Sequence, residues 1–270
     1  MRIAFIGGGT MAEAMVSAFL RENVVPPSDI IVADIAAERL RRLRDAHGVT
    51  AASGNVEALE GADTVILAVK PGQFAAVASE LSGKIKPEQT VLSIMAGLTV
   101  TTIRDTLSHP AVVRAMPNTA AQVGEAATAW TAAADVTADA RERVRGLLRT
   151  LGSEVYFDDE KYIDMATAVS GSGIGFVFVL MEAFIDGAVH IGVPRQAAAE
   201  MVVQTFAGAA RLARESGKTA AELRALVTTP GGTTAEGLLA LEAAGVRAAI
   251  AEALIAAYEK SKSLGSGPAT

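Results

Sequence analysis

The sequence predicts an α/β fold in which a mostly parallel sheet is followed by an all-helical domain. Apolar runs of strand length alternate with helical patterns up to about residue 160, and this alternation is typical of parallel sheets. From Tyr162 onward the pattern is helical alone. A glycine-rich turn after the first strand indicates a ligand site there. We expect a sheet domain over residues 1–160, a helical domain over 161–264 and a disordered tail over 265–270.

The glycine turn follows the apolar run Ile3–Ile6 and precedes a helical pattern. Gly7, Gly9 and Ala12 form Gly-x-Gly-x-x-Ala, in which the first glycine permits the turn and the second lets a pyrophosphate approach the backbone. Unpaired N–H groups at the helix start would meet the phosphates. The alternative is an ordinary strand-to-helix turn, but the context favours a Rossmann-type dinucleotide site.

An acidic residue follows the second predicted strand, Asp29–Ala33. The carboxylate of Asp34 can hydrogen-bond the adenosine ribose hydroxyls and would repel a 2′-phosphate. Arg39 or Arg41 on the next helix would soften that repulsion. The residue therefore favours NAD slightly, and the choice between NAD and NADP stays open.

The later strands deliver special segments to one edge of the sheet. Strands are expected at Val49–Ala52, Thr64–Val69, Thr90–Ile94, Ala111–Ala115, Ala126–Ala132 and Glu154–Phe157, and helices at Ala36–Ala46, Val56–Leu59, Phe74–Leu81, Val100–Leu107 and Ala138–Leu151. Ligands in open α/β sheets lie beyond the carboxyl ends of strands. Lys70 and Pro71 are therefore expected at the cofactor crevice, and the segments 95–97 and 116–119 reach the same edge.

The helical half carries more apolar surface than it can bury alone. Helices are expected at Tyr162–His190, Pro194–Glu215, Ala220–Leu226, Thr234–Ala243 and Val246–Lys262. Apolar residues occupy nearly every face of the first two, which indicates either a buried core helix of a large monomer or a protein interface. We favour an interlocked homodimer.

Composition excludes several classes of protein. The 270 residues carry a net charge of −6, so neither nucleic acid nor an anionic membrane surface is an expected partner. The absence of cysteine excludes disulfides and thiolate metal sites and fits the cytoplasm. The charge-free run Met165–Met181 is interrupted by serines and glycines and is shorter than a typical membrane span. We therefore expect no membrane segment.

Two segments of small residues in the second half could receive an anion. The segment 169–173 (Val-Ser-Gly-Ser-Gly) begins or interrupts a long helix, and the segment 228–234 (Thr-Thr-Pro-Gly-Gly-Thr-Thr) precedes another. The alternative for each is a capped helix start, but a neighbouring dinucleotide domain favours a site for a small carboxylate. His47, His109 and His190 are expected to be structural or solvated, Trp130 to lie in the core, and no metal site is expected.

Five ordered motifs resemble the pyrroline-5-carboxylate reductase family over residues 1–264. They are Ile6–Ala12, Ala68–Pro71, Ala115–Thr119, Val169–Gly173 and Pro230–Thr234. The resemblance implies a Rossmann domain, interleaved helical dimerisation domains and hydride transfer from NADPH or NADH to a cyclic imino acid, 1-pyrroline-5-carboxylate, giving L-proline. A homodimer that assembles further is left open.

The same resemblance implies the site residues. Together with Asp34, the cofactor contacts would be Ile6, Gly7, Gly9, Thr10, Met11, Asn55, Ala68, Val69, Lys70, Pro71, Met95, Ala96 and Gly97. The substrate contacts would be Ser172, Thr229, Gly231, Gly232, Thr233 and Thr234, and the resemblance leaves open whether the partner subunit supplies the loop. Thr234 would hydrogen-bond the imine nitrogen, as the catalytic residue.

The residues agree with this chemistry in one respect. A protonated imine is already electrophilic, whereas ketone reduction needs a positioned acid; the region after Gly173, where related hydroxyacid dehydrogenases carry a catalytic lysine, is apolar. Alternatives are a hydroxyacid dehydrogenase, a related imine reductase with another substrate, and a non-catalytic dinucleotide-binding protein. Ile174 and Gly175 depart from the Pro-Ala usual in the family, and Thr229 replaces a common serine.

Overall fold

The computed structural model describes residues 1–265, so residues 266–270 of the predicted tail lie outside the described residues. The chain divides into two compact units. Of the described residues, the first unit comprises Met1–Ser172 and 257–265, and the second comprises Gly173–Ala256. The domain boundary expected at residue 160 stays a prediction. Helix α7 (Lys161–Ala166) belongs to the first unit because it packs against strands β6 and β7.

The first unit is built on an eight-stranded sheet with the order β3-β2-β1-β4-β5-β6-β7-β8. The strands are β1 (Ile3–Ile6), β2 (Ile30–Ala33), β3 (Thr50–Ala51), β4 (Thr64–Leu67), β5 (Thr90–Ser93), β6 (Val112–Met116), β7 (Ala126–Ala132) and β8 (Gly152–Tyr156). All neighbouring pairs are parallel except β6 and β7. The mostly parallel sheet is therefore confirmed, and the strand order reverses between β1 and β4, where doubly wound sheets bind their ligands.

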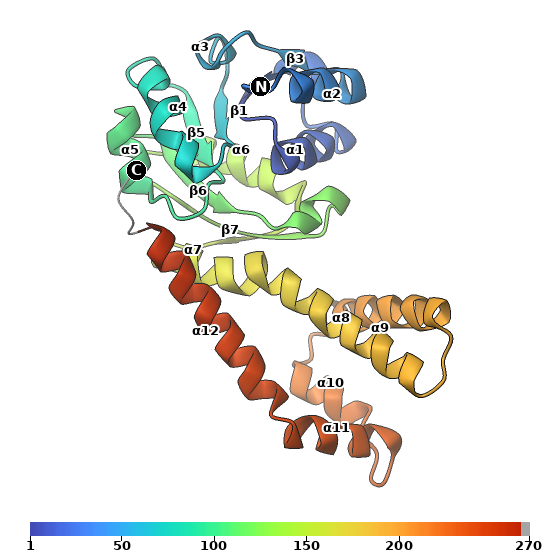
Figure 1. Cartoon of the computed structure of the whole chain (residues 1–270). Helices are drawn as coiled ribbons and strands as arrows, with labels where there is room; N and C mark the ends of the chain where they lie inside the picture. The colour runs from blue at the N-terminus through green and yellow to red at the C-terminus, as the bar shows by residue number, and fades with distance from the viewer. Residues whose placement is uncertain (266–270) are drawn as a thin grey trace. The chain divides into compact units, whose positions relative to one another are not determined.

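Helices and short helical turns connect these strands (Figure 1). They are α1 (Thr10–Arg21), α2 (Ala37–His47), α3 (Asn55–Ala58), α4 (Phe74–Leu81), α5 (Val100–Leu107), α6 (Ala138–Arg149) and α7, with 3₁₀ turns η1 (Pro27–Asp29), η2 (Pro71–Gln73) and η3 (Thr119–Val123). Every residue of β1, β2, β4 and β5 is buried. Such continuous burial is the property of parallel strands that are covered on both faces.

Aromatic residues anchor the core on both sides of the strand-order reversal. Phe5 on β1 and Phe19 on α1 are fully buried, with ring centroids 6.1 Å apart. Trp130 on β7 is also fully buried, which confirms its expected place in the core. Its indole N–H donates to the Glu154 carboxylate at 2.6 Å, so the one polar atom of the ring is satisfied.

The second unit is helical, as expected. It contains α8 (Gly173–His190), α9 (Arg195–Ser216), α10 (Ala220–Leu226), α11 (Thr233–Ala243) and the first part of α12 (Val246–Gly265). Helices α8 and α9 pack side by side (Figure 1), with the rings of Phe184 and Phe206 5.3 Å apart, edge to face. Yet no residue of α8 is buried, and large apolar side chains such as Phe178 and Met201 are 55% and 63% exposed.

Helix α8 continues α7 without a break. The two helices are joined by a π-helical turn, η4 (Thr167–Ser172), so that Lys161–His190 forms one helical stretch of 30 residues. By length and composition this stretch could cross a membrane, so the expectation that the apolar run is too short for a span was wrong. The glycines and serines of the segment widen one helical turn instead of ending the helix.

Gly152 offers a test of the fold at the start of β8. Its φ is +141°, and a Cβ there would lie 2.3 Å from the carbonyl oxygen of Ala126. We expect Gly152→Ala to lower the free energy of unfolding by about 1–3 kcal/mol through backbone strain, with a further loss from the clash. Urea denaturation followed by circular dichroism measures this.

Gly146→Ala is the matched control, because Gly146 lies within α6 and a Cβ there meets nothing within 4 Å. We expect this variant to be as stable as the parent or stabilised by roughly 0.5–1 kcal/mol. Equal stability of the two variants would contradict the β7–β8 pairing described above.

Candidate active site

The glycine turn after β1 is shaped by its neighbours on β4 and β2. Gly7 has φ +103°, and a Cβ there would lie 2.7 Å from the carbonyl oxygen of Ala68, so only glycine fits. Its N–H donates to Ala33 O at 2.8 Å. The turn therefore sits directly at the place where the strand order reverses.

Gly9 differs from Gly7 in having open space beside it. It is the N-cap of α1, with φ −74°, and a Cβ there would meet nothing within 4 Å. The backbone N–H groups of the first turn of α1, including those of the predicted phosphate ligands Thr10 and Met11, have no partner within the helix. Open space in front of a helix N-terminus is the arrangement that accepts a pyrophosphate.

Asp34 is held against the glycine turn. Its Oδ2 accepts the N–H of Gly8 at 2.7 Å and its Oδ1 accepts the N–H of Ala36 at 2.7 Å, while Arg39 Nη1 lies 3.4 Å from Oδ2. The side chain is only 4% exposed. Sequence reasoning assigned the carboxylate to the ribose alone and missed this second role as a brace for the turn. Oδ2 accepts from both Gly8 and Arg39, whereas Oδ1 keeps one lone pair that could accept a hydrogen bond from a hydroxyl.

The predicted contacts that follow β4 lie on the other side of the strand-order reversal. Ala68 N–H donates to Ile6 O at 2.9 Å, which continues the β1–β4 pairing past the last strand residues. Lys70 is exposed, and Pro71 begins the turn η2. Ile6, Ala68, Val69, Lys70 and Pro71 are thus brought together with the glycine turn at the carboxyl edge of the sheet.

The remaining predicted cofactor residues lie in two loops of the same unit. Met95, Ala96 and Gly97 follow β5; Met95 is almost fully buried, and Gly97 has φ +75°. Asn55 begins α3 and donates from Nδ2 to Glu80 Oε2 at 2.8 Å. The amide of Asn55 is therefore held by α4, and its contact with a cofactor stays a prediction.

Ser172 ends the π-helical turn, so the segment 169–173 interrupts a helix and does not begin one. Ser170 donates its hydroxyl to Ala166 O at 2.9 Å. Asn118, which follows β6, donates from Nδ2 to Ser170 O at 3.1 Å and so holds the turn from the sheet side. Sequence reasoning placed Asn118 at this edge without a role; the signal was an amide directly after Pro117 at a strand end.

The loop that precedes α11 is a separate cluster of hydroxyls and backbone N–H groups in the second unit. Gly231 has φ +67°, and a Cβ on Gly232 would lie 2.3 Å from Thr229 Oγ1. The Thr229 hydroxyl therefore packs against the N-cap of α11, which starts at Thr233. Thr229 and Thr233 are exposed and Thr234 is half-buried. Gly231 and Gly232 are required by this local geometry.

His109 has a structural role in the first unit. His109 is almost fully buried, its Nε2 lies 2.8 Å from Gln89 O, and burial lowers its pKa below the ordinary value. A neutral, structural imidazole follows. Among residues 1–265, no group of three histidine, aspartate or glutamate side chains is placed to hold a metal ion.

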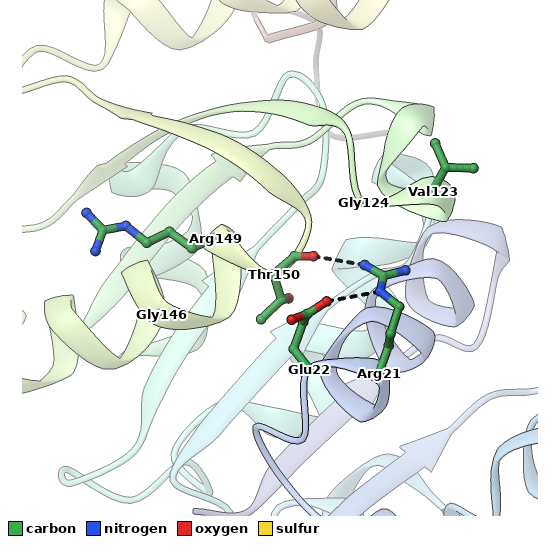
Figure 2. Close-up of a pocket in the computed structure, with 7 residues that line it drawn as sticks. All are labelled: Arg21, Glu22, Val123, Gly124, Gly146, Arg149 and Thr150. Carbon is green, nitrogen blue, oxygen red and sulfur yellow. Dashed lines mark hydrogen bonds and ion pairs between the residues drawn. The ribbon is translucent and has the colours of Figure 1, made fainter. Parts of the chain in front are cut away.

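A surface cavity of about 510 Å³ lies elsewhere in the first unit, and Figure 2 shows its lining residues. Arg21 at the end of α1 donates to Thr150 O at 3.3 Å, just past the end of α6, and to Glu22 Oε1 at 3.1 Å. A cation beside carbonyls at a helix end is a common stabilising arrangement. No predicted site residue lines this cavity, and we assign it no part in the site.

A doubly wound sheet, with a glycine turn where its strand order reverses and an acidic residue after β2, is the arrangement typical of dinucleotide-binding proteins. Comparisons with known proteins narrow the class. Residues 160–264 match the family model described as pyrroline-5-carboxylate reductase dimerisation, and residues 2–97 match the one described as NADP oxidoreductase, coenzyme F420-dependent.

Relatives match over the whole chain. A pyrroline-5-carboxylate reductase of Pseudomonas aeruginosa is 39% identical over 97% of this chain and 96% of its own. The structure of one from Coxiella burnetii has a TM-score of 0.89 at 34% identity, covering 98% and 99% of the two chains. The structure of a pyrroline carboxylate reductase from Plasmodium falciparum with NADP bound has a TM-score of 0.87 at 27% identity, covering 98% of each chain. The chain belongs to the pyrroline-5-carboxylate reductase family, as the five motifs predicted.

The open space at Gly9 permits a test of the cofactor site that spares the fold. We expect Gly9→Ala to weaken dinucleotide binding about tenfold or more, because its methyl group would fill the space before the helix N-terminus. Isothermal titration with NADH and NADPH measures the dissociation constants. The melting temperature should stay close to that of the parent, since the chain itself leaves the position empty.

Gly146→Ala again serves as the control and should bind both dinucleotides as the parent does. Unchanged affinity in Gly9→Ala would exclude the glycine turn as the pyrophosphate site.

Proposed function

We propose that this chain reduces 1-pyrroline-5-carboxylate to L-proline, the last step of proline biosynthesis, with NADPH or NADH as the hydride donor. The observation that carries the proposal is the open glycine turn where the strand order reverses, in a chain whose whole length matches reductases of this name. The family relationship supports the substrate, and the turn supports the dinucleotide.

The predicted cofactor residues fall into two groups, one on each side of the point where the strand order reverses. We assign the pyrophosphate to Ile6, Gly7, Gly9, Thr10 and Met11, the adenosine ribose to Asp34, and a further contact on the adenosine side to Asn55. We assign the other half of the dinucleotide to the segments 68–71 and 95–97, because β4 and β5 lie beyond the reversal of strand order.

The charge on Asp34 favours NADH over NADPH. The carboxylate is fixed by two backbone N–H groups and cannot swing away from a 2′-phosphate. Arg39 lies 3.4 Å from it and is half-exposed, so it reduces the repulsion in part. We infer a modest preference for NADH.

The reaction needs little acid catalysis from the protein. The reduced nicotinamide supplies a hydride to the imine carbon; the C=N double bond becomes single, and the nitrogen keeps its proton and gains a lone pair. We propose that Thr234 hydrogen-bonds that nitrogen. The backbone and hydroxyls of Thr229 and the segment 231–233 would bind the carboxylate at the start of α11, and Ser172 would contribute its hydroxyl. Positioning is then the main source of the rate.

We propose that the helical unit forms a homodimer and that the protein works in the cytoplasm. The match of residues 160–264 to a dimerisation region supports the first, together with the exposed apolar residues of α8 and α9. A second chain, rather than a bilayer, would cover the apolar stretch Lys161–His190. Light scattering after size exclusion distinguishes a dimer from a larger assembly, and the cysteine-free composition supports the compartment.

Absorbance at 340 nm tests the reaction. We expect substrate-dependent oxidation of NADH and of NADPH with 1-pyrroline-5-carboxylate, faster with NADH at low cofactor concentration because of Asp34. The six-membered cyclic imine, tested with the reduced cofactors, and a set of 2-hydroxyacids, tested with the oxidised cofactors, serve as comparison substrates. A clear preference for either would replace the proposal with a related imine reductase or a hydroxyacid dehydrogenase, and binding without any turnover would leave a non-catalytic protein.

Thr234 offers a test of the substrate loop. We expect Thr234→Ala to lower kcat about tenfold or more while the dissociation constant of the cofactor changes less than about twofold, because the lost hydrogen bond concerns the imine nitrogen alone. Thr234→Ser keeps the hydroxyl and should retain most of the activity. A parallel loss of cofactor affinity, or equal loss in both variants, would contradict the assignment.

A further inference from the structure

A buried arginine sits among segments of the first unit that are far apart in sequence. Arg114 on β6 is fully buried; its Nη1 donates to Glu160 Oε1 at 2.9 Å and its Nη2 to Asp164 Oδ1 at 2.8 Å. Ser261 on α12 donates to the same Asp164 oxygen at 3.3 Å. The Arg114 guanidinium thus joins β6 to the start of α7, close to Ser172, where the first part of this unit ends. Asp164 also joins α7 to the part of α12 that belongs to the same unit.

The two carboxylates differ in what else they hold. Glu160 Oε1 also accepts the backbone N–H of Val100 at 2.8 Å, and Val100 is the first residue of α5. This N–H has no partner within the helix, and a carboxylate beside a helix N-terminus is further stabilised by the helix dipole. Asp164 makes no such contact with α5; its other partner is Ser261.

Glu160 therefore fixes the end of the loop between β5 and α5, residues 94–99. The start of this loop is fixed by the bonds from Ile94 N to Leu67 O at 3.1 Å and from Met95 N to Ser93 Oγ at 3.3 Å. Ala96 in its middle packs on an apolar cluster that contains Ile163 of α7. The loop is thus fixed at two points, by the hydrogen bond from Val100 to Glu160, the N-cap of α7, and by the apolar contact of Ala96 with the cluster that contains Ile163.

We propose that Glu160, held by Arg114, is a positioning residue that sets the loop 94–99 for the nicotinamide half of the cofactor. The inference rests on the proposed function in one respect, that this loop meets the nicotinamide. The loop follows β5, which lies on the side of the strand-order reversal opposite to Asp34 and the adenosine half. Displacement of a positioning group by about 1 Å can lower a rate by up to about 100-fold.

The pair Glu160→Ala and Asp164→Ala tests the proposal. Each variant leaves Arg114 with one carboxylate, so both share the loss of one ion pair, and only Glu160→Ala releases the N–H of Val100. We measure dissociation constants for the reduced dinucleotide that the parent binds more tightly, and for the matching ADP-ribose or its 2′-phosphate, which lack the nicotinamide. Thermal melting shows that each variant is folded.

We expect Glu160→Ala to weaken binding of the reduced dinucleotide about fivefold or more and to lower kcat about tenfold, with ADP-ribose binding within about twofold of the parent. Asp164→Ala should stay within about twofold of the parent in its affinity for the dinucleotide, its affinity for ADP-ribose and its kcat. Glu160→Gln keeps a carbonyl oxygen for Val100 and Arg114 and should recover most of both losses. These results would support a positioning role.

Equal effects of Glu160→Ala and Asp164→Ala would overturn the proposal, because the ion pairs would then serve stability alone. Equal weakening of the dinucleotide and ADP-ribose by Glu160→Ala would also overturn it, since the loss would not concern the nicotinamide. The binding measurements stay decisive if the parent shows no turnover with the imine, so failure of the proposed function is recognised separately.

Discussion

The packing of the turn after β1 against β4 is the constraint on which the first unit depends. Gly7 can adopt φ +103° beside the carbonyl of Ala68 only because it has no side chain. Its place is fixed by pairing, since β1 bonds to both β2 and β4. The strand order reverses here, so the turn opens toward the solvent at the carboxyl edge. The Asp34 carboxylate completes the arrangement by holding the N–H of Gly8. The pairing of β1 with its two neighbours therefore fixes both the shape of the glycine turn and the position of the Asp34 carboxylate beside it.

The second unit differs from the first because much of its apolar surface is exposed. No residue of α8 is buried. Its exposed apolar side chains include Phe178 and Phe184, and those of α9 include Met201. Exposed apolar surface of this extent marks a site of interaction with another surface. The family match assigns these residues to a dimerisation region. The sheet unit, by contrast, has its own buried core.

Much of the fold could be predicted from the sequence because its signals are local. Phe74–Leu81, Val100–Leu107 and Ala126–Ala132 were predicted with the bounds that the structure shows, since periodicity and flanking turn residues both mark them. The antiparallel pairing of β6 and β7 was not predicted, because direction depends on the short connection through η3 and not on strand composition. The π-helical turn was also missed, since glycines and serines predict a break as readily as a widened turn.

The candidate site, like the fold, could be predicted only where a local sequence pattern marks it. Motif spacing indicated the glycine turn, the segment after β4 and the loop before α11. The bonds of Asp34 to Gly8 and of Glu160 to Val100 join residues 26 and 60 positions apart, and no local pattern marks such pairs. Arg114 lies within an apolar strand pattern and gave no sign of its role, because a buried charge is recognised only by its partners.

Deuterium transfer from the cofactor to the product tests whether the protein moves a hydride from the dinucleotide to the imine. The protein is incubated with 1-pyrroline-5-carboxylate and reduced dinucleotide that carries deuterium at C4 of the nicotinamide, and the product is analysed by mass spectrometry and NMR. We expect L-proline with one deuterium on the ring carbon that was double-bonded to nitrogen, because the proposed hydride transfer passes directly from the cofactor to that carbon. Proline without deuterium when the transferred hydrogen is labelled, or no proline from folded, cofactor-bound protein, would contradict it.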